Sequence, residues 1–510
     1  MHIPSLSTAI SLLLLISSTT SSPLIEVTHF QNGLTLAASP TSQLLACLKP
    51  LGGKVLTSKD PKYNEERYVF DHRHTYLPQV IVMANSVSDV KIAVKCATAN
   101  KVAVAPRSGG HSYEGYSIGG EDGSLVVDLG GLTSVIVKNG VAKVGAGVRL
   151  GRLYLELFHQ GGYTLNAGTC SSVGVGGLAL GGGFGLLGPK YGLLIDRIIE
   201  MKVVNAQGKL LTVSSTSHPD LFYALRGAGA GSFGVVTEFT FLPIKPAPTV
   251  TSFSYNWEHK DYATVLDAFI AFPTLASDDI GTKINVGPNG LRMSGLFEGT
   301  KDDQLRVMAP FFAKVPKPKR NDVREGRYID AQLRLAGIPN DPKDINDLLL
   351  KVDPRTRKGK SLVYPRALEA STIALLGKWS ATQPSGAKAI YLLVLLYGGG
   401  VSKVPENATS FVHRNTHTVI EFMVDWTRDP NAHGEVCEAC LEWMHDMYSE
   451  FLDDFKTHYG PVRGYQNYID IEIPNWQDAY YGSALPRLKQ IKRAVDPENT
   501  FRFPQSIPLY

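Results

Sequence analysis

Two strongly nucleophilic side chains, His111 and Cys170, lie in separate glycine-rich stretches of the chain. His111 follows the run Pro-Arg-Ser-Gly-Gly at 106–110, and Cys170 lies near the start of a glycine-rich segment at 168–185. Glycine tolerates positive φ and lets the backbone approach a ligand closely, and runs of exposed backbone N–H groups bind anions such as a pyrophosphate. We therefore expect a large phosphate-bearing cofactor that is held from two sides.

A nicotinamide-binding fingerprint is the competing interpretation of the second segment. Gly174-Val-Gly-Gly-Leu-Ala179 fits the pattern GxGxxA, which requires a buried strand before it and a helix that opens at the loop. Residues 164–170 are only weakly strand-like, and the glycines at 181–183 stand where the helix should run. The pattern therefore disfavours a nicotinamide site.

A carboxylate interrupts an otherwise apolar strand pattern at 418–424, which reads Thr-Val-Ile-Glu-Phe-Met-Val. A buried charge is costly unless it has a partner or a function. Strand alternation places Val419, Glu421 and Met423 on one face. Glu421 is therefore a candidate functional group, with an ion pair to a nearby Arg or Lys as the alternative.

The first half of the chain alternates strands and helices that could position these residues. A strand, a helix and a strand at 80–83, 87–99 and 102–105 indicate a βαβ unit. Further elements are expected as strands at 124–128, 142–144 and 235–241, helices at 41–49, 150–160 and 220–226, and a hairpin at 198–204 and 209–213.

A proline-rich linker at 243–248 separates this half from a region of longer strands, which indicates an antiparallel sheet. A long amphipathic helix is expected at 434–455, and the tail from 465 is expected to form a strand and then two helices. The strands are expected at 251–255, 282–286, 291–298, 389–397 and 416–424. The predicted fold class is α+β, with a cofactor domain at 23–246, a substrate domain at 247–457 and a return to the cofactor domain at 458–510.

Composition and charge exclude several classes of protein. A hydrophobic content of 44% and a charged content of 19% are typical of a globular protein. A net charge of +4 over 510 residues, without a Lys/Arg cluster, argues against binding nucleic acid. Residues 1–22 are expected to be a secretory signal, whose apolar core at 9–16 is too short to span a bilayer. We expect a soluble, secreted protein with no membrane span and a glycosylation sequon at Asn407.

Five cysteines are compatible with an oxidising compartment. Cys47 and Cys96 lie on helix-like stretches and are the expected pair. Cys437 and Cys440 form a CxxC, for which a local disulfide or two buried thiols are both favoured over zinc, because no second CxxC completes a metal site. One cysteine, in the glycine-rich segment, is left over. The Asp-His-Arg-His run at 71–74 is expected to be solvated rather than metal-binding, so no metal is predicted.

Four motifs are specific enough to compare with known families. They are Arg-Ser-Gly-Gly-His-Ser-Tyr at 107–113, Gly-Thr-Cys-x-x-Val-Gly-Val-Gly-Gly at 168–177, Tyr-x-Asn-Tyr-x-Asp at 465–470 and Asp-Pro-Glu-Asn-Thr-Phe-Arg-Phe-Pro-Gln-Ser-Ile-Pro at 496–508. Together they resemble the flavoprotein oxidases of the berberine bridge enzyme-like family, in the vanillyl-alcohol-oxidase superfamily, and look nearest to fungal oligosaccharide oxidases. The resemblance implies a two-part FAD-binding domain of the PCMH type and an α+β substrate domain.

The resemblance also implies how FAD is held. In this family the histidine that matches His111 is bonded to the 8α-methyl of FAD, and the cysteine that matches Cys170 is bonded to C6. Val173 matches the small residue that lets dioxygen reach the flavin. The other residues expected to hold the cofactor are Arg107, Ser108, Gly109, Gly110, Ser112, Thr169, Gly174, Gly176, Gly177, Gly181, Gly234, Val235 and Asn467.

Three residues are expected to be catalytic. The family's base corresponds to Tyr468, and Tyr113 matches a tyrosine that lines the same site. Deprotonating an unperturbed tyrosine at pH 7 costs about 4 kcal/mol, so the base needs a depressed pKa or proton transfer concerted with hydride loss. At Glu421 the family often has glutamine, and some alkaloid-cyclising members use a glutamate there as the base.

The chain departs from the family pattern at several positions. Leu178 stands where the family usually has a histidine near the flavin, and Phe184 stands where some plant members have a tyrosine. The sugar oxidases have an aspartate in the strand near Leu395, and this chain has none there. The tyrosine–aspartate pair that activates a sugar's anomeric hydroxyl is therefore not matched.

The expected function is that of a secreted, monomeric FAD oxidase. It would take a hydride from a CH–OH carbon, with C1 of a reducing oligosaccharide as the favoured substrate and a lactone as the product, and reduce O2 to H2O2. The alternative is the same chemistry on an alkaloid, an aromatic alcohol or another secondary metabolite, with Glu421 as the base. A third possibility is a retained flavin scaffold that serves as a binding or surface protein.

Overall fold

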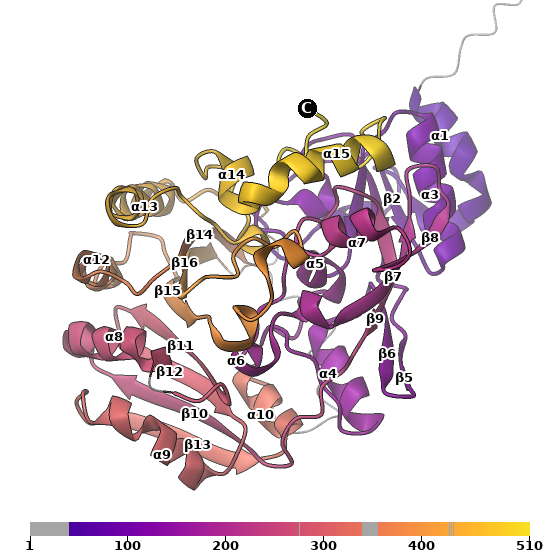
Figure 1. Ribbon diagram of the computed structural model, residues 1–510. Helices are drawn as coiled ribbons and strands as arrows, with labels where there is room; N and C mark the ends of the chain where they lie inside the picture. The colour runs from indigo at the N-terminus through magenta and orange to yellow at the C-terminus, as the bar shows by residue number, and fades with distance from the viewer. Residues whose placement is uncertain (1–39, 275, 339–354, 428, 430, 432) are drawn as a thin grey trace, which may run out of the picture. The chain divides into compact units, whose positions relative to one another are not determined.

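Three β-sheets organise the part of the chain that the computed structural model describes, which is residues 40–510 without 275, 339–354, 428, 430 and 432 (Figure 1). The expected signal at 1–22 lies outside the described residues. Among the described helices, none is both long enough and apolar enough to cross a membrane.

The first sheet contains the predicted βαβ unit. Strands β2 (Val80–Met83) and β3 (Val104–Arg107) both run parallel to β4 (Leu125–Asp128), which lies between them. Helix α3 (Val87–Ala99) connects β2 to β3, and the Ser86 side chain caps it by accepting a hydrogen bond from Asp89 N. The prediction is confirmed, although β3 begins two residues later than expected. A short strand, β1 (Val55–Leu56), completes the sheet at the edge.

The second sheet is antiparallel and lies in the order β5-β6-β9-β7-β8. Its strands are β5 (Val135–Lys138), β6 (Val141–Gly145), β9 (Val235–Phe241), β7 (Ile198–Val204) and β8 (Leu210–Ser214). The hairpin expected from the sequence is β7 and β8, which pair directly. Helices α4 (Leu150–His159), α5 (Val175–Leu180) and α6 (Gly188–Tyr191) lie between β6 and β7, and α5 lies within the second glycine-rich segment.

Helix α5 corrects one part of the sequence analysis. The glycines at 181–183 argued against a helix in this segment, but α5 begins directly after Gly174 and ends at Leu180, just before those glycines, after six residues. The other objection to a nicotinamide fingerprint holds, because residue Thr164 forms only an isolated bridge with Ile244 rather than a strand before the loop.

The third sheet is antiparallel, has seven strands and runs in the order β13-β10-β12-β11-β15-β16-β14. Its strands are β13 (Arg320–Gly326), β10 (Val250–Trp257), β12 (Gly290–Phe297), β11 (Ile280–Gly287), β15 (Ala389–Leu396), β16 (Thr418–Thr427) and β14 (Thr356–Tyr364). The sequence patterns did not predict β13 and β14. Both strands are rich in charged residues, so neither shows the apolar alternation that marks a half-buried strand.

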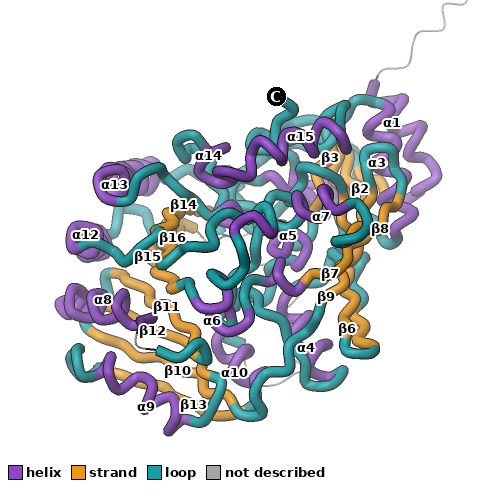
Figure 2. Tube along the Cα trace, viewed as in Figure 1, coloured by secondary structure: helices purple, strands orange, loops and turns teal. Residues whose placement is uncertain are grey.

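Four helices cover one face of the third sheet, as Figures 1 and 2 show. They are α8 (Tyr262–Ala271), α9 (Lys301–Phe312), α12 (Ala370–Ser380) and α13 (Glu438–His458). Strand residues such as Phe422 and helix residues such as Phe451 share a core on this side. On the other face, Leu395 and Val419 join the core of the first half of the chain. We call this second face of the third sheet, which the four helices do not cover, the open face. It is directed toward the glycine-rich segments.

The C-terminal tail returns to the first half of the chain. Helices α14 (Trp476–Tyr481) and α15 (Leu485–Val495) confirm the two predicted helices, and beyond them Val104 N donates to Thr500 O. The strand expected after 465 is wrong. Residues Gln466–Tyr468 form a 3-10 turn instead, held where the Asn467 amide donates to Leu178 O at 3.1 Å.

Two disulfides are present, Cys47–Cys96 and Cys437–Cys440, and Cys170 is free. The expected first pair is confirmed, and the CxxC forms the local disulfide, which was one of its two favoured alternatives. It lies at the first turn of α13, so that helix begins at Glu438 rather than at 434.

Replacing both Cys47 and Cys96 by alanine is expected to lower the free energy of unfolding by about 4 kcal/mol, because their bond restricts a long loop of the unfolded chain. The two cysteines are separated by 49 residues. Urea unfolding of the variant would measure the loss. The control is the double variant Cys437→Ala, Cys440→Ala, whose two cysteines are separated by only 3 residues in the sequence. The same loop-entropy model gives a loss of about 2 kcal/mol in its free energy of unfolding. Equal losses in both variants would contradict the loop argument.

Candidate active site

A cavity of about 1840 Å³, partly open to solvent, lies where the two glycine-rich segments meet the open face of the third sheet. It brings together residues from the glycine-rich segments, the third sheet and the C-terminal turn. Predicted site residues that line it are Ser108, Gly109, Gly110, His111, Ser112, Tyr113, Thr169, Cys170, Val173, Gly174, Gly176, Gly177, Gly234, Glu421, Asn467 and Tyr468.

The two glycine-rich segments touch along their backbones. A Cβ atom added to Gly109 would lie 2.2 Å from Gly174 N, so neither position has room for a side chain. Arg149 ties the segments together, because its Nη1 donates to Gly109 O at 3.2 Å and to Ser172 O at 2.5 Å. The backbone of both segments is thereby exposed to one cavity.

Ser172 connects the two nucleophiles. Its Oγ lies 3.0 Å from His111 Nε2 and 3.4 Å from Cys170 Sγ. The ring of Phe70 stacks on the His111 ring with centroids 4.0 Å apart. Burial, followed by the positive charge of Arg149, lowers the pKa of His111 to about 3. The imidazole is therefore neutral near pH 7 and has a lone pair for bonding. Neither Ser172 nor Phe70 was predicted from the sequence as a site residue.

These features suit FAD. Backbone N–H groups of glycine-rich segments can receive a pyrophosphate. Two nucleophiles face the same space, one a neutral, half-buried imidazole and the other an exposed free thiol. His111 and Cys170 would hold the ring system, with the glycine-rich segments around the phosphates.

Three predicted cofactor residues do not line the cavity. The Arg107 side chain is directed to the Asp128 carboxylate, with Nε and Oδ2 2.5 Å apart, and so joins β3 to β4. Val235 is fully buried in the core. Gly181 instead makes room for Asn467, since a Cβ there would lie 2.0 Å from the amide oxygen. All three residues therefore support the residues that line the cavity and do not line it themselves.

Tyr113, Tyr468 and Glu421 form one cluster. The Tyr113 hydroxyl donates to Glu421 Oε1 at 2.6 Å, and the rings of Tyr113 and Tyr468 are parallel with centroids 5.8 Å apart. Gly359 on β14 leaves room for Tyr113, because a Cβ there would lie 2.8 Å from the tyrosine ring. Glu421 is 7% exposed and forms a hydrogen bond here rather than the ion pair that was its alternative interpretation.

Burial is the largest cause of the pKa shifts in this cluster. It raises the pKa of Glu421 above the ordinary value, while hydrogen bonding to Tyr113 and the charge of Arg357 act in the opposite direction. Burial and the nearby Glu421 carboxylate raise the pKa of Tyr468 well above the ordinary value, and the same two causes act on Tyr113. The cluster therefore keeps its tyrosines protonated and contains one carboxylate.

Two cations that the sequence analysis missed also line the cavity. Lys283 on β11 donates to Thr169 Oγ1 at 3.2 Å, and burial lowers the pKa of its amine. Arg357 on β14 lies over the Phe70 ring, 4.5 Å from the centroid. Among the described residues that line the cavity, Glu421 is the only carboxylate. Strand alternation alone could have placed Lys283 on the open face, as it did Glu421.

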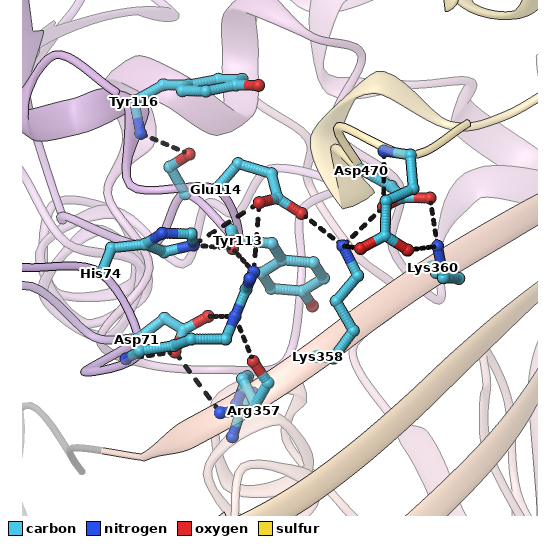
Figure 3. Close-up of polar contacts among 12 residues, drawn as sticks. Asp71, His74, Tyr113, Glu114, Tyr116, Arg357, Lys358, Lys360 and Asp470 are labelled. Carbon is cyan, nitrogen blue, oxygen red and sulfur yellow. Dashed lines mark hydrogen bonds and ion pairs between the residues drawn. The ribbon is translucent and has the colours of Figure 1, made fainter. Parts of the chain in front are cut away.

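A buried network of ion pairs holds the backbone of Tyr113 (Figure 3). The Tyr113 carbonyl accepts from Arg73 Nη2 at 3.1 Å and lies 3.0 Å from His74 Nε2. Arg73 also pairs with Glu114, whose other oxygen accepts from Lys358 at 2.9 Å. The network continues through Lys358 to Asp470 at 2.7 Å and from Asp470 to Lys360 at 3.0 Å.

This network corrects the interpretation of residues 71–74, which were expected to be solvated. Asp71 and His72 are 1% and 6% exposed, because β14 packs over the segment and Arg355 N donates to Phe70 O. No group of three or more potential metal ligands occurs in the described part of the chain. The run serves the ion network instead.

Comparisons with known proteins find relatives over most of the chain. The family described as "FAD binding domain" matches residues 78–214, and "Berberine and berberine like" matches residues 464–508. A xylooligosaccharide oxidase from Thermothelomyces thermophilus is 30% identical over 92% of this chain and 96% of its own length. A reticuline oxidase from Papaver somniferum is 28% identical over 84% of each chain. The solved structure of BBE-like 1 from Physcomitrella patens is 34% identical, with a TM-score of 0.84 over 92% of this chain and 99% of that one.

Proposed function

Because this chain belongs to the berberine bridge enzyme-like family of FAD-linked oxidoreductases, we propose that it is a secreted oxidase that binds FAD covalently through His111 and Cys170. It oxidises a CH–OH carbon, and O2 is the final electron acceptor, giving H2O2. The favoured substrate is a reducing oligosaccharide, oxidised at C1 to a lactone. The two disulfides suit the oxidising compartment that secretion implies.

One observation carries the proposal: both nucleophiles and the hydrogen-bonded pair of Tyr113 and Glu421 line the same cavity. FAD, when bound, supplies the acceptor for a hydride. The chain must then supply a site for the proton that leaves the substrate hydroxyl, in water-poor surroundings. The carboxylate and the tyrosines provide that site on the open face of the third sheet.

Glu421 is the proton acceptor in this proposal. Burial raises the pKa of Tyr468 well above its ordinary value, so a tyrosinate would be costly at neutral pH. A carboxylic acid has an ordinary pKa of about 4.3, far below that of tyrosine, and the Tyr113 hydrogen bond and the charge of Arg357 oppose the effect of burial on the pKa of Glu421. Glu421 is therefore better matched than a tyrosine to accept a proton. Tyr468 orients the substrate hydroxyl, and Tyr113 holds Glu421 through its hydrogen bond. The family resemblance, by contrast, implied Tyr468 as the base.

Two substrate classes have support. The xylooligosaccharide oxidase relative favours a carbohydrate. The reticuline oxidase relative and the carboxylate at 421, together with the apolar residue at 395, favour an alkaloid or aromatic alcohol as the alternative. In either case a small molecule enters the cavity from the open side.

Peroxide release tests the proposal. The purified holoenzyme is incubated with mono- and oligosaccharides, aromatic alcohols and alkaloids, and H2O2 and anaerobic bleaching of the flavin are measured. Reducing oligosaccharides are expected to give both signals. If no sugar gives either signal and an aromatic alcohol or alkaloid bleaches the flavin, the alternative substrate class is supported. A flavin that no compound bleaches would indicate a binding scaffold.

Mass spectrometry tests the covalent links. We expect one FAD to join the tryptic peptides that hold His111 and Cys170, and Cys170→Ala to leave FAD attached through His111 alone. Because Ser172 contacts both nucleophiles, Ser172→Ala is expected to lower the fraction of doubly attached flavin. Ser171→Ala, at the adjacent position, is the matched control. Unmodified peptides from yellow wild-type protein would refute covalent attachment while leaving FAD binding intact.

A further inference from the structure

The third sheet also carries a polar groove, whose lining residues are different from those of the cavity. It lies at one end of strands β10, β11, β12, β13 and β15 and has a volume of about 1700 Å³, part of it open to solvent. None of the residues assigned to cofactor binding or catalysis lines it. Polar and charged residues that line the groove include Asn256, Glu258, Asn285, Arg292, Arg320 and Lys388.

Strand register connects the groove to Glu421. Each residue of the following row is the direct cross-strand partner of the next, and the row runs outward from the cavity: Glu421, Leu393, Asn285, Arg292, Asn256 and Arg320. Directly opposed residues in antiparallel strands project from the same face, so the row lies on the open face. With strands about 4.8 Å apart, Arg292 lies about 14 Å and Arg320 about 24 Å from Glu421 along the sheet.

The groove has a surplus of positive charge. Its two carboxylates are already paired, Glu258 with Lys319 and Lys260, and Asp322 with Arg324 and Arg334. By contrast, Arg292, Arg320 and Lys388 form no ion pair with a described residue. Three cations along one groove, without carboxylates of their own, favour an anionic ligand.

Hydrogen-bonding capacity in the groove also remains unused. The side-chain oxygen of Asn285 is buried and has no partner among the described residues. Arg292 uses Nε to bond Ser254 Oγ at 3.1 Å, which leaves its terminal N–H groups for a ligand. Arginine presents these groups in a planar fork that matches a carboxylate. The row thus combines an acceptor for hydroxyl groups with donors for an acid group.

We propose that this groove binds the part of a chain-like substrate that extends beyond the oxidised unit, and that it selects a carbohydrate chain with carboxylate-bearing sugars. Arg292 and Arg320 bind the carboxylates, and Asn285 accepts a hydrogen bond from a sugar hydroxyl. The inference rests on the proposed oxidation of a carbohydrate and specifies its substrate class. Arg292 and Arg320 act on binding alone, because their distance from Glu421 keeps them away from the reacting carbon.

Calorimetric titration of the holoenzyme tests the groove without turnover. The probe is a hexamer of a hexuronic acid, long enough to reach both arginines from the oxidised unit, whose reducing end has been converted to an alditol. The matched probe is a neutral hexamer treated likewise. We expect the acidic probe to bind at least tenfold more tightly, and added salt to weaken its binding. Combined Arg292→Gln and Arg320→Gln changes should weaken the acidic probe by about tenfold or more and leave the neutral probe unchanged.

Arg306→Gln, on α9 at the helix-covered face, is the control and should have no effect on either probe. Equal affinity for the two probes, or no loss in the double variant, would overturn the inference. Peroxide assays with the unreduced hexamers separate this result from the proposed function. In these assays the double variant should raise KM for the acidic hexamer and leave kcat unchanged. If the acidic alditol binds as expected but no carbohydrate yields peroxide, the proposed oxidation fails and the groove assignment stands.

Discussion

Replacing Glu421 by glutamine is expected to lower kcat by about 100- to 10,000-fold, the range typical for loss of a positioned general base. Glutamine preserves the size of the side chain and can still accept the Tyr113 hydrogen bond, which is 2.6 Å long in the wild type. It cannot take up the substrate proton. Stopped-flow measurement of flavin bleaching isolates this step from reoxidation by O2. Tyr113→Phe is the matched comparison, because it removes the hydrogen bond and keeps the carboxylate.

The pH dependence of flavin bleaching is an independent test of Glu421 as the base. The active form of Glu421 is the carboxylate, and burial raises its pKa above 4.5. The bleaching rate should therefore be full above this raised pKa and fall as the pH decreases through it. The acidic limb should vanish in Glu421→Gln. A variant that retains full turnover would exclude Glu421 as the base and return that role to Tyr468.

Replacing Lys358 by methionine is expected to destabilise the protein by about 3–5 kcal/mol, the cost of leaving buried charges without their partner. Lys358 is 1% exposed and pairs with Glu114 and Asp470, which are 2% and 1% exposed. The midpoint of urea unfolding measures the effect. Because the network also holds the Tyr113 backbone, the variant that remains folded should turn over more slowly.

Two variants separate the network from a general effect of losing a lysine. Lys378 pairs with Glu450 on the surface, with both side chains at least 40% exposed, so Lys378→Met should cost no more than about 1 kcal/mol. Combining Lys358→Met with Glu114→Gln should recover part of the stability, since removing one negative charge offsets the positive charge lost from the buried network. Equal effects of the two lysine substitutions would show that the buried pairs contribute little.

Local sequence determined much of the scaffold. The βαβ unit, the hairpin β7–β8 and most strands of the third sheet follow from hydrophobic periodicity, which depends on neighbours a few residues apart. The same holds for the face on which Glu421 lies. Strands β13 and β14 were not predicted, because their charged residues mask the alternation of apolar and polar residues. Lys358 and Lys360 are buried on β14 only because acidic partners from distant segments neutralise them.

The sequence by itself thus determined the fold class, the two glycine-rich segments and the identity of the two nucleophiles. Tertiary structure alone decided what these groups touch. Tyr113 and Glu421 are 308 positions apart, and His111 and Ser172 are 61 apart. Contacts over such separations arise when segments far apart in the chain pack together, and no local pattern encodes them. The same packing buries the carboxylate and partly buries both tyrosines. The resulting loss of solvation shifts their pKa values and sets the chemistry available to the site.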